Sequence, residues 1–217
     1  MRPTMVRRLS GHRGPVYALA VRGDRVLSGS GDGMVAAWDA NGAAGEAVAQ
    51  VGQAVFALTV LDEPEALVIG TEGGELHVVD LRDRREVQHL VLHRRGIFRI
   101  AALGKDRVVC AGGDGTLSVW TVRRDAQGPR LALQRQIPIT EEKLRDVAVH
   151  AAAGLVAVAC GDGTVRVLDR EDLNERLLAP MVKVQPRTPL GRLLTAARLR
   201  RAQRWLAEIE PGLQFAP

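Results

Sequence analysis

The chain has 217 residues, of which 46% are apolar but only 3% aromatic, so its core must be built mainly from Val, Leu, Ala and Ile. The formal net charge is +5, and residues 181–217, with seven Lys and Arg against two Glu, account for all of it. A uniformly basic nucleic-acid-binding domain is therefore excluded, and we expect a neutral body of residues 1–180 with a basic tail.

A segment of about forty residues occurs four times in the neutral body. The copies end at Trp38, Val79, Trp120 and Leu168, which gives two intervals of 41 residues and one of 48. Each copy contains short apolar runs separated by Asp-Gly or Gly-Gly, which favours tight hairpins because these residues tolerate positive φ. The turn pairs are Asp32-Gly33, Gly73-Gly74, Asp114-Gly115 and Asp162-Gly163. A fixed period of this size predicts repeated small antiparallel sheets.

The first copy places Gly11-His12 before its first strand and Trp38-Asp39 at the end of its third. In these residues the chain resembles the Trp-Asp-repeat (WD-repeat) β-propellers, over about residues 9–180. The resemblance implies an all-β propeller of four-stranded antiparallel blades, expected at about 9–50, 51–91, 92–137 and 138–180. Family members usually have more than four blades. Four blades therefore either close as an unusually wedge-shaped ring, or leave an edge that favours self-association.

Three polar residues of the first copy have the types of a nucleophilic triad: His12, Ser28 and Asp32. The family resemblance implies a structural role instead, a buried hydrogen-bond tetrad of these three with Trp38. In the third copy it implies a partial tetrad of His93, Asp114 and Trp120, with Cys110 at the position of Ser28, where it could mimic a thiol nucleophile. We favour the structural interpretation, because a triad is recognised by geometry and not by sequence proximity.

No other motif of a catalytic or cofactor site is found. The sequence has no phosphate-binding loop, no spaced carboxylates of a calcium loop and no Cys/His set with metal-ligand spacing. We interpret His77, His89 and His150 as polar surface or edge residues. Cys110 and Cys160 fall at non-equivalent positions and form no disulfide framework. We therefore predict a cytoplasmic, non-enzymatic protein without cofactor, metal, signal peptide or transmembrane segment.

Three of the four Tyr and Phe residues occupy one position of the repeat, at the start of the first strand. They are Tyr17, Phe56 and Phe98, and the fourth copy has Arg145 there. In the family that it resembles, this end of the strand lies at the mouth of the central channel, and aromatic residues and Arg are enriched at binding hot spots. These four residues are the candidate partner-binding set. The alternative is that the rings only pack between neighbouring blades.

The repeat pattern ends near residue 180, and a helix is predicted over about 189–210. Thr188 suits its cap and Pro189 its first turn, and Pro211-Gly212 ends it. Its basic residues are Arg192, Arg198, Arg200, Arg201 and Arg204. The helix either covers the last blade, binds nucleic acid or an anionic surface, or is the product of a truncated or frame-shifted gene.

The favoured function is a non-catalytic protein–protein interaction scaffold whose partner docks at the channel mouth. The expected partners are other proteins, including a second copy that completes the ring. The alternative is a nucleic-acid or anionic-surface adaptor acting through the Arg-rich helix, which we favour less because single-strand binding usually needs more stacking aromatics than Trp205 alone.

Overall fold

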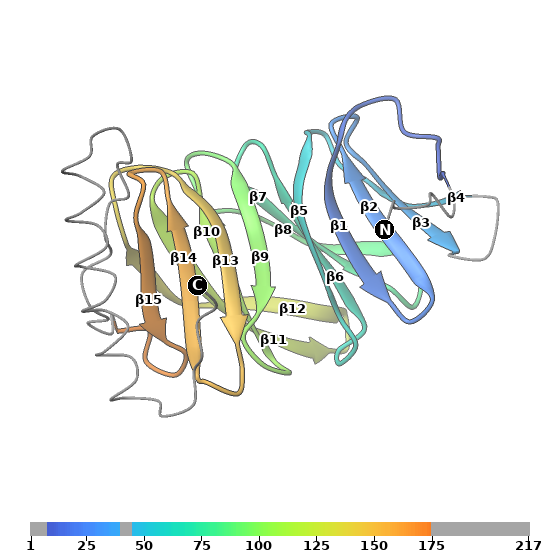
Figure 1. The fold of residues 1–217 in the computed structure, drawn as a ribbon. Helices are drawn as coiled ribbons and strands as arrows, with labels where there is room; N and C mark the ends of the chain where they lie inside the picture. The colour runs from blue at the N-terminus through green and yellow to red at the C-terminus, as the bar shows by residue number, and fades with distance from the viewer. Residues whose placement is uncertain (1–7, 40–44, 175–217) are drawn as a thin grey trace, which may run out of the picture. The chain divides into compact units, whose positions relative to one another are not determined.

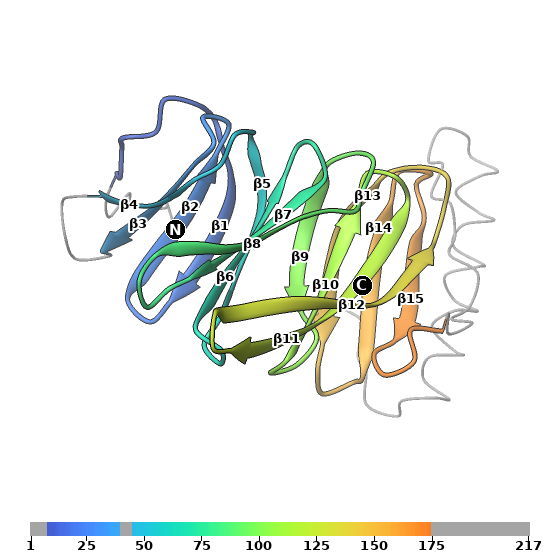
Figure 2. The same ribbon diagram turned by 180° about the vertical axis from the view of Figure 1, so that it is seen from behind.

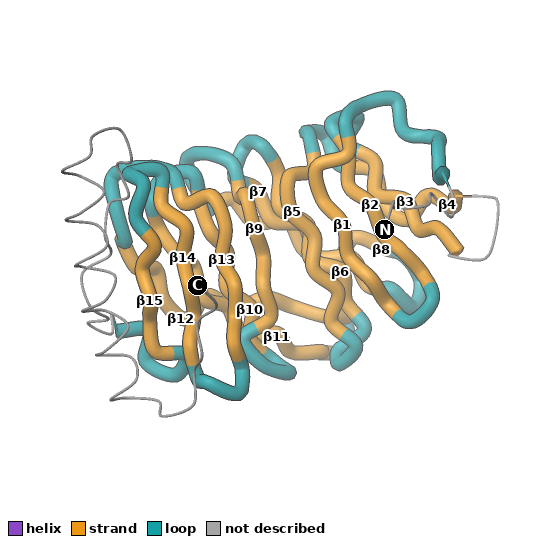
Figure 3. Tube along the Cα trace, viewed as in Figure 1, coloured by secondary structure: helices purple, strands orange, loops and turns teal. Residues whose placement is uncertain are grey.

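The computed structural model describes residues 8–39 and 45–174 of the chain. The chain divides into two compact units, residues 1–174 and 175–217, and the described residues all belong to the first. Every regular element in them is a β-strand, which confirms the predicted all-β class (Figures 1 and 3). The helix predicted over 189–210, with Arg192, Arg198, Arg200, Arg201 and Arg204, lies outside the described residues.

The strands form four antiparallel sheets, each made of strands that follow one another along the chain. We call these sheets blades 1 to 4. Blade 1 contains β1 (Val16–Arg22), β2 (Arg25–Ser30), β3 (Met34–Asp39) and β4 (Gly45–Gln50). Blade 2 contains β5 (Val55–Leu61), β6 (Ala66–Thr71), β7 (Glu75–Asp80) and β8 (Arg85–Val91). Blade 3 contains β9 (Ile97–Ala102), β10 (Arg107–Gly112), β11 (Thr116–Asp125) and β12 (Gly128–Pro138). Within the described residues blade 4 has three strands, β13 (Leu144–His150), β14 (Leu155–Cys160) and β15 (Val165–Asp169).

The turn between the second and third strands of every blade ends in a glycine with positive φ. The φ values of Gly33, Gly74, Gly115 and Gly163 are 77°, 90°, 81° and 82°. Residues with a Cβ rarely adopt this conformation. The Asp-Gly and Gly-Gly pairs thus fix the hairpins that align each blade.

The first strand of each blade packs against the first strand of the next one. β1 contacts β5, β5 contacts β9 and β9 contacts β13, and Figures 1 and 2 show these strands side by side from the two opposite views. A separate apolar cluster fills each of the three spaces between blades. We call these spaces seams. Most of the hydrophobic burial therefore occurs between repeats, as expected when one repeat cannot bury its own apolar face.

Each blade has two apolar faces, which we name by the blade that they contact. The leading face contacts the preceding blade, and in blade 2 it includes Val55 and Leu58. The trailing face contacts the next blade, and in blade 1 it includes Leu27 and Val35. Gly29, on β2, lies so close to Val55 that a Cβ there would overlap its side chain. The small residue therefore allows blades 1 and 2 to approach closely.

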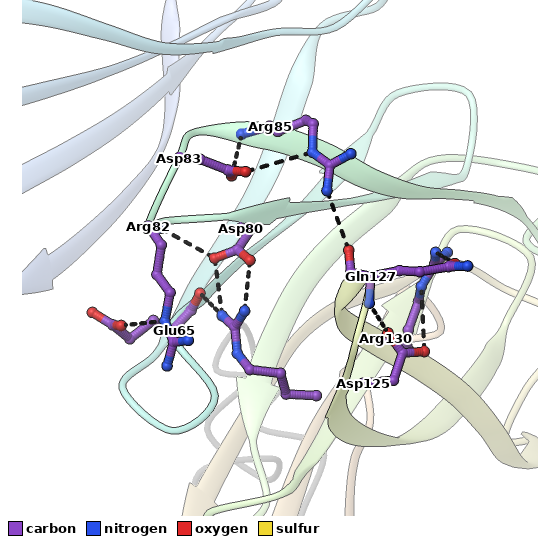
Figure 4. A network of polar contacts seen from close by, with 9 residues as sticks. Glu65, Asp80, Arg82, Asp83, Arg85, Asp125, Gln127 and Arg130 are labelled. Carbon is purple, nitrogen blue, oxygen red and sulfur yellow. Dashed lines mark hydrogen bonds and ion pairs between the residues drawn. The ribbon is translucent and has the colours of Figure 1, made fainter.

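A charged network joins blades 2 and 3 at one end of their seam (Figure 4). The carboxylate of Asp80, on β7, accepts hydrogen bonds from Nη1 and Nη2 of Arg124, on β11, at 2.6 and 2.9 Å. The same guanidinium donates to the backbone carbonyl of Glu65 at 3.3 Å. The hydrogen bonds from Arg124 lower the pKa of Asp80 to about 2. The carboxylate is thus ionised at neutral pH, and its ion pair with Arg124 links blade 2 to blade 3.

Candidate functional site

The four predicted tetrad residues of blade 1 lie in one hydrogen-bonded chain. Nε2 of His12 and Oγ of Ser28 are 2.7 Å apart, and Nε1 of Trp38 donates to the same hydroxyl at 2.7 Å. Nδ1 of His12 lies 3.4 Å from the carboxylate of Asp32, which also accepts from the backbone N–H of Arg13 at 2.7 Å. The chain ties the loop before β1 to strands β2 and β3.

Burial opposes the ionisation of Asp32, but hydrogen bonds outweigh it. They come from the backbone N–H groups of Arg13 and Met34 and from the Ser30 hydroxyl, and they lower the pKa of Asp32 to about 2. A charged carboxylate therefore faces the histidine at neutral pH.

Blade 3 has the same chain of contacts, but its hydroxyl comes from a residue that sequence reasoning missed. His93 contacts Asp114 through Nδ1 at 3.0 Å and Oγ of Ser118 through Nε2 at 2.8 Å. Nε1 of Trp120 donates to Ser118 at 2.8 Å. Ser118 lies directly across from Cys110 in the β10–β11 ladder. The serine has moved from the second strand, where blade 1 has Ser28, to the third.

The connectivity Asp–His–Ser of these two chains is that of a catalytic triad, but the serine is closed to substrate. Ser28 is 4% exposed and Ser118 is fully buried, and both hydroxyls already interact with a histidine and an indole N–H. Cys110 is also fully buried, and burial raises the pKa of its thiol to about 12. Because a thiolate is the nucleophilic form, Cys110 is inert. The geometry is that of a brace between strands.

Blade 2, which lacks the tetrad, instead carries a polar cluster on β7 and β8. Glu75, His77 and His89 bring three ligand atoms within 4.8 Å of one another. The rings of His77 and His89 are stacked, with centroids 4.5 Å apart. Our interpretation of His77 as a surface or edge residue was wrong, because it is 6% exposed. The two histidines are a cross-strand pair, which only the β7–β8 register could have shown.

The candidate partner-binding residues form one continuous row across the four blades, which we call the aromatic row. The Tyr17 and Phe56 rings meet edge to face with centroids 5.1 Å apart, and the Phe56 and Phe98 centroids are 5.6 Å apart. The guanidinium of Arg145 lies 5.4 Å from the Phe98 centroid, and Nζ of Lys143 lies 5.9 Å from it. The row therefore ends in two cations held by the ring face.

The rings of this row are not core residues. Tyr17 is 54% exposed and both phenylalanines are half-buried. The glycines that precede the turn aspartates allow the rings of Tyr17 and Phe98 to lie close to the backbone. A Cβ at Gly31 would be 3.2 Å from the Tyr17 ring, and one at Gly113 would be 2.8 Å from the Phe98 ring. These glycines offer no side chain for recognition themselves, but they make room for the aromatic rings, which can contact a partner.

Below the aromatic row, all four first strands line one groove. Its volume is about 490 Å³, and residues of β1, β5, β9 and β13 form its walls. The groove lies where the resemblance implies a central channel. Among the residues that the structure describes, no helix has the length and apolar character needed to cross a membrane.

Comparisons with known proteins agree with this architecture. The family model "WD domain, G-beta repeat" matches residues 3–39. Two curated relatives are the DDB1- and CUL4-associated factor 11 homologs of Caenorhabditis elegans and Caenorhabditis briggsae, which are 33% identical over 78 residues and 32% identical over 87. The matches cover 35% and 39% of this chain but only 14% and 16% of those proteins.

Three solved structures resemble the chain over most of its length. The computationally designed Ika4 protein has a TM-score of 0.61 at 25% identity, covering 77% of this chain and 99% of its own. The designed Ika8 protein has a TM-score of 0.60 at 26% identity, covering 74% of this chain and 48% of its own. A chain of the mitotic checkpoint complex has a TM-score of 0.60 at 14% identity, covering 70% of this chain and 46% of its own.

The repeated four-stranded blades, the closed His–Ser–Trp braces and these matches define a repeat protein of the β-propeller class. The WD40 match on its first repeat and the partial matches to the two nematode proteins support a WD-repeat protein. Proteins of this kind are generally non-catalytic and act through interactions with other proteins.

Proposed function

We propose that this protein is a non-catalytic scaffold whose partner docks across the aromatic row. The observation that supports this is the continuity of Tyr17, Phe56 and Phe98 across two seams, with Arg145 extending the row to blade 4. The rings are fixed by their contacts with one another, so little side-chain entropy is lost when a partner binds. Rigid aromatic anchors beside Arg are the usual composition of binding hot spots.

The chemistry of the row favours an acidic segment with apolar side chains. Lys143 and Arg145 stand at the blade 4 end, and Arg95 lies beside Phe98 against Gly113. Rings provide apolar contact area, and the cations beside them attract carboxylates. We therefore expect the partner to present a large apolar side chain next to Asp or Glu. The names of the two nematode relatives associate those proteins with DDB1 and CUL4, which supports the scaffold class.

The test is selection of displayed peptides on the full chain, followed by affinity measurements on variants. The substitutions Tyr17→Ser, Phe56→Ser and Phe98→Ser together should weaken selected peptides more than tenfold without changing the circular dichroism spectrum. Arg145→Glu should weaken the binding of acidic peptides selectively, and the difference in affinity between this variant and wild type should depend on the salt concentration. Val91→Ser is the matched control, because Val91 is 71% exposed on β8 and apart from the row. Equal affinity in the triple variant and in the control refutes the docking site.

We also propose that the scaffold self-associates, because the leading face of blade 1 is uncovered. Val16 and Leu19 are 49% and 61% exposed, whereas their equivalents in blade 2, Val55 and Leu58, are 0% and 4% exposed. The equivalents in blades 3 and 4 are buried as well, at Ile97, Ile100, Leu144 and Val147. The same repeat position thus faces solvent in blade 1 alone among the four blades described. Exposed apolar surface of this kind favours association.

The proposed occupant of this face is the trailing face of blade 4 in a second copy. At the three seams described, each leading face is covered by the trailing face of the preceding blade. The corresponding trailing residue of blade 4, Val165, is 39% exposed, whereas its blade 1 equivalent, Val35, is fully buried. The chain matches 48% of Ika8 and 46% of the mitotic checkpoint chain, so two copies have the extent of one such protein. Two copies related by a twofold axis would share two identical seams.

Light scattering on a sizing column tests the second copy. The full chain should have about twice its 23.4 kDa mass, and Leu19→Asp should return it to the monomer without unfolding. Leu133→Asp is the control, since Leu133 is 46% exposed on β12, away from both end faces. A monomer at every concentration, or a dimer unaffected by Leu19→Asp, excludes this arrangement and leaves the aromatic-row proposal to its own test.

A further inference from the structure

We propose that the cluster of Glu75, His77 and His89 on blade 2 is a binding site for a divalent transition-metal ion, with Zn²⁺ as the natural occupant. Two imidazole nitrogens and one carboxylate oxygen form a ligand set that zinc commonly uses. The three ligand atoms come from neighbouring strands and already lie within 4.8 Å of one another.

The strand register brings the ligands together. Glu75 and His77 are two residues apart on β7, so their side chains leave the same face of the strand. His77 and His89 are directly opposite each other in the β7–β8 ladder. Oε2 of Glu75 lies 3.5 Å from Nε2 of His77 and 3.2 Å from Nε2 of His89. One carboxylate oxygen thus faces both ring nitrogens.

Two further residues orient the ligands as the outer shell of a metal site does. Oε1 of Glu86 lies 2.9 Å from Nδ1 of His77 and accepts its proton, which leaves Nε2 with a free lone pair. Nε2 of Gln53 donates to Oε1 of Glu75 at 3.0 Å, so Oε2 is the oxygen left to face the histidines. A histidine held by a carboxylate on one nitrogen and open on the other is the usual form of a metal ligand.

The open nitrogen of His77 is also a buried polar atom without a hydrogen-bond partner. Among the residues described, the only other such side-chain atom is Nε of Arg124. In the braces of blades 1 and 3 the corresponding nitrogen is satisfied, because Nε2 of His12 and of His93 contacts a serine hydroxyl. A buried unsatisfied acceptor is costly, and a cation at this point would remove the cost.

Binding needs only a small rearrangement, and it concerns the exposed ligand. The two imidazole rings are stacked with centroids 4.5 Å apart and an interplanar angle of 6°, so one metal ion cannot yet lie in the planes of both rings. The His89 side chain is 47% exposed and can turn toward the cluster, while His77 stays fixed by Glu86. Exposure on the His89 side also leaves a coordination position for water. The site therefore resembles an open three-ligand zinc site more than a closed structural one.

The experiment uses the full chain after treatment with a chelator, titrated with zinc chloride by calorimetry. Wild-type protein should bind one Zn²⁺ per chain, and His89→Ala should weaken binding at least tenfold while the protein stays folded. His150→Ala is the matched control, because His150 is an exposed histidine on blade 4. A competing thiol site is tested with Co²⁺, whose visible bands should appear without the near-ultraviolet thiolate charge-transfer band. Absence of saturable binding, or equal affinity in the two histidine variants, overturns the proposal.

Glu86→Gln and Glu86→Ala test the outer shell separately. Glu86 lies beside His77 and outside the proposed ligand set. Glutamine keeps an acceptor for Nδ1 of His77 but loses the charge, so zinc affinity should fall less than in the alanine variant. An alanine variant that binds zinc as tightly as wild type contradicts the role assigned to Glu86.

Discussion

Removal of the Ser118 hydroxyl should destabilise the protein more than a typical substitution of a small polar residue. Ser118 is fully buried, and its oxygen accepts the indole proton of Trp120 and contacts Nε2 of His93. Ser118→Ala leaves two buried groups without partners, each at a cost of about 1–3 kcal/mol. We therefore expect the free energy of unfolding to fall by about 2–4 kcal/mol. Ser28→Ala should have a similar effect in blade 1, where the same two contacts are lost.

The exchange of serine between strands supplies a rescue variant. Cys110 faces Ser118 across the ladder and occupies in blade 3 the position that Ser28 has in blade 1. Adding Cys110→Ser to Ser118→Ala should restore a hydroxyl between His93 and Trp120 and recover at least half of the loss. Equilibrium urea unfolding followed by tryptophan fluorescence measures all variants. The brace is refuted if Ser118→Ala lies within about 0.5 kcal/mol of wild type, a value typical of neutral substitutions, or if the double variant is no more stable than the single one.

Two further predictions concern a seam and a turn. Because Arg124 lowers the pKa of Asp80 from 3.8 to about 2, the stability that this pair contributes is complete above pH 4 and is lost as the pH falls through 2. Asp80→Asn should lower the free energy of unfolding at pH 7 by about 1–2 kcal/mol, because solvent screens part of the ion pair. In urea unfolding measured between pH 4 and 2, the free energy of unfolding of the variant should fall less steeply with pH than that of wild type. An equal fall in both proteins contradicts the role assigned to this pair. Gly115→Ala and Gly163→Ala share a φ near 80°, but only at Gly115 would the new Cβ overlap a neighbour, the carbonyl oxygen of Thr140. Gly163→Ala should lower the free energy of unfolding by about 1 kcal/mol, and Gly115→Ala should lower it clearly more. Equal losses in the two variants, measured by the same assay, would mean that the positive φ alone sets the loss and that the overlap contributes nothing.

The repeat architecture could be predicted from the sequence because each blade repeats its own local signals. The Asp-Gly turns fix hairpins within a few residues, and the period between Trp38, Val79 and Trp120 shows how many sheets to expect. The aromatic row could also be predicted from the sequence, since equivalent positions of neighbouring repeats lie side by side. What the sequence left undecided was whether the rings are core or surface. The 54% exposure of Tyr17 indicates surface at that end of the row.

The features that sequence reasoning missed depend on contacts across a ladder or across a seam. Ser118 supplies the hydroxyl of the blade 3 brace from the strand opposite Cys110. A position-by-position alignment of the repeats points to Cys110 alone, because it searches only the strand that carries Ser28 in blade 1. The histidine pair depends on the same kind of register between β7 and β8. The uncovered face of blade 1 has a different cause. Val16 and Leu19 have the same sequence character as Val55 and Leu58, and only the presence of a preceding blade distinguishes a core residue from an exposed one.

The brace and the proposed metal site occupy the same place in the repeat. By position within the third strand, His77 of blade 2 corresponds to Ser118 of blade 3 and to Ala36 of blade 1. In blade 3 that residue links a histidine to an indole, whereas blade 2 has neither and carries two histidines and a carboxylate there. A zinc ion bound to Glu75, His77 and His89 would link β7 to β8 through coordination, whereas blades 1 and 3 link their strands through a shared hydroxyl. Since ligand binding to the folded state stabilises it, zinc should raise the unfolding midpoint of wild-type protein more than that of His89→Ala at the same zinc concentration. If the wild-type midpoint does not respond to zinc where calorimetry shows the ion bound, the unfolded chain binds zinc as tightly as the folded one, and the bracing role is refuted.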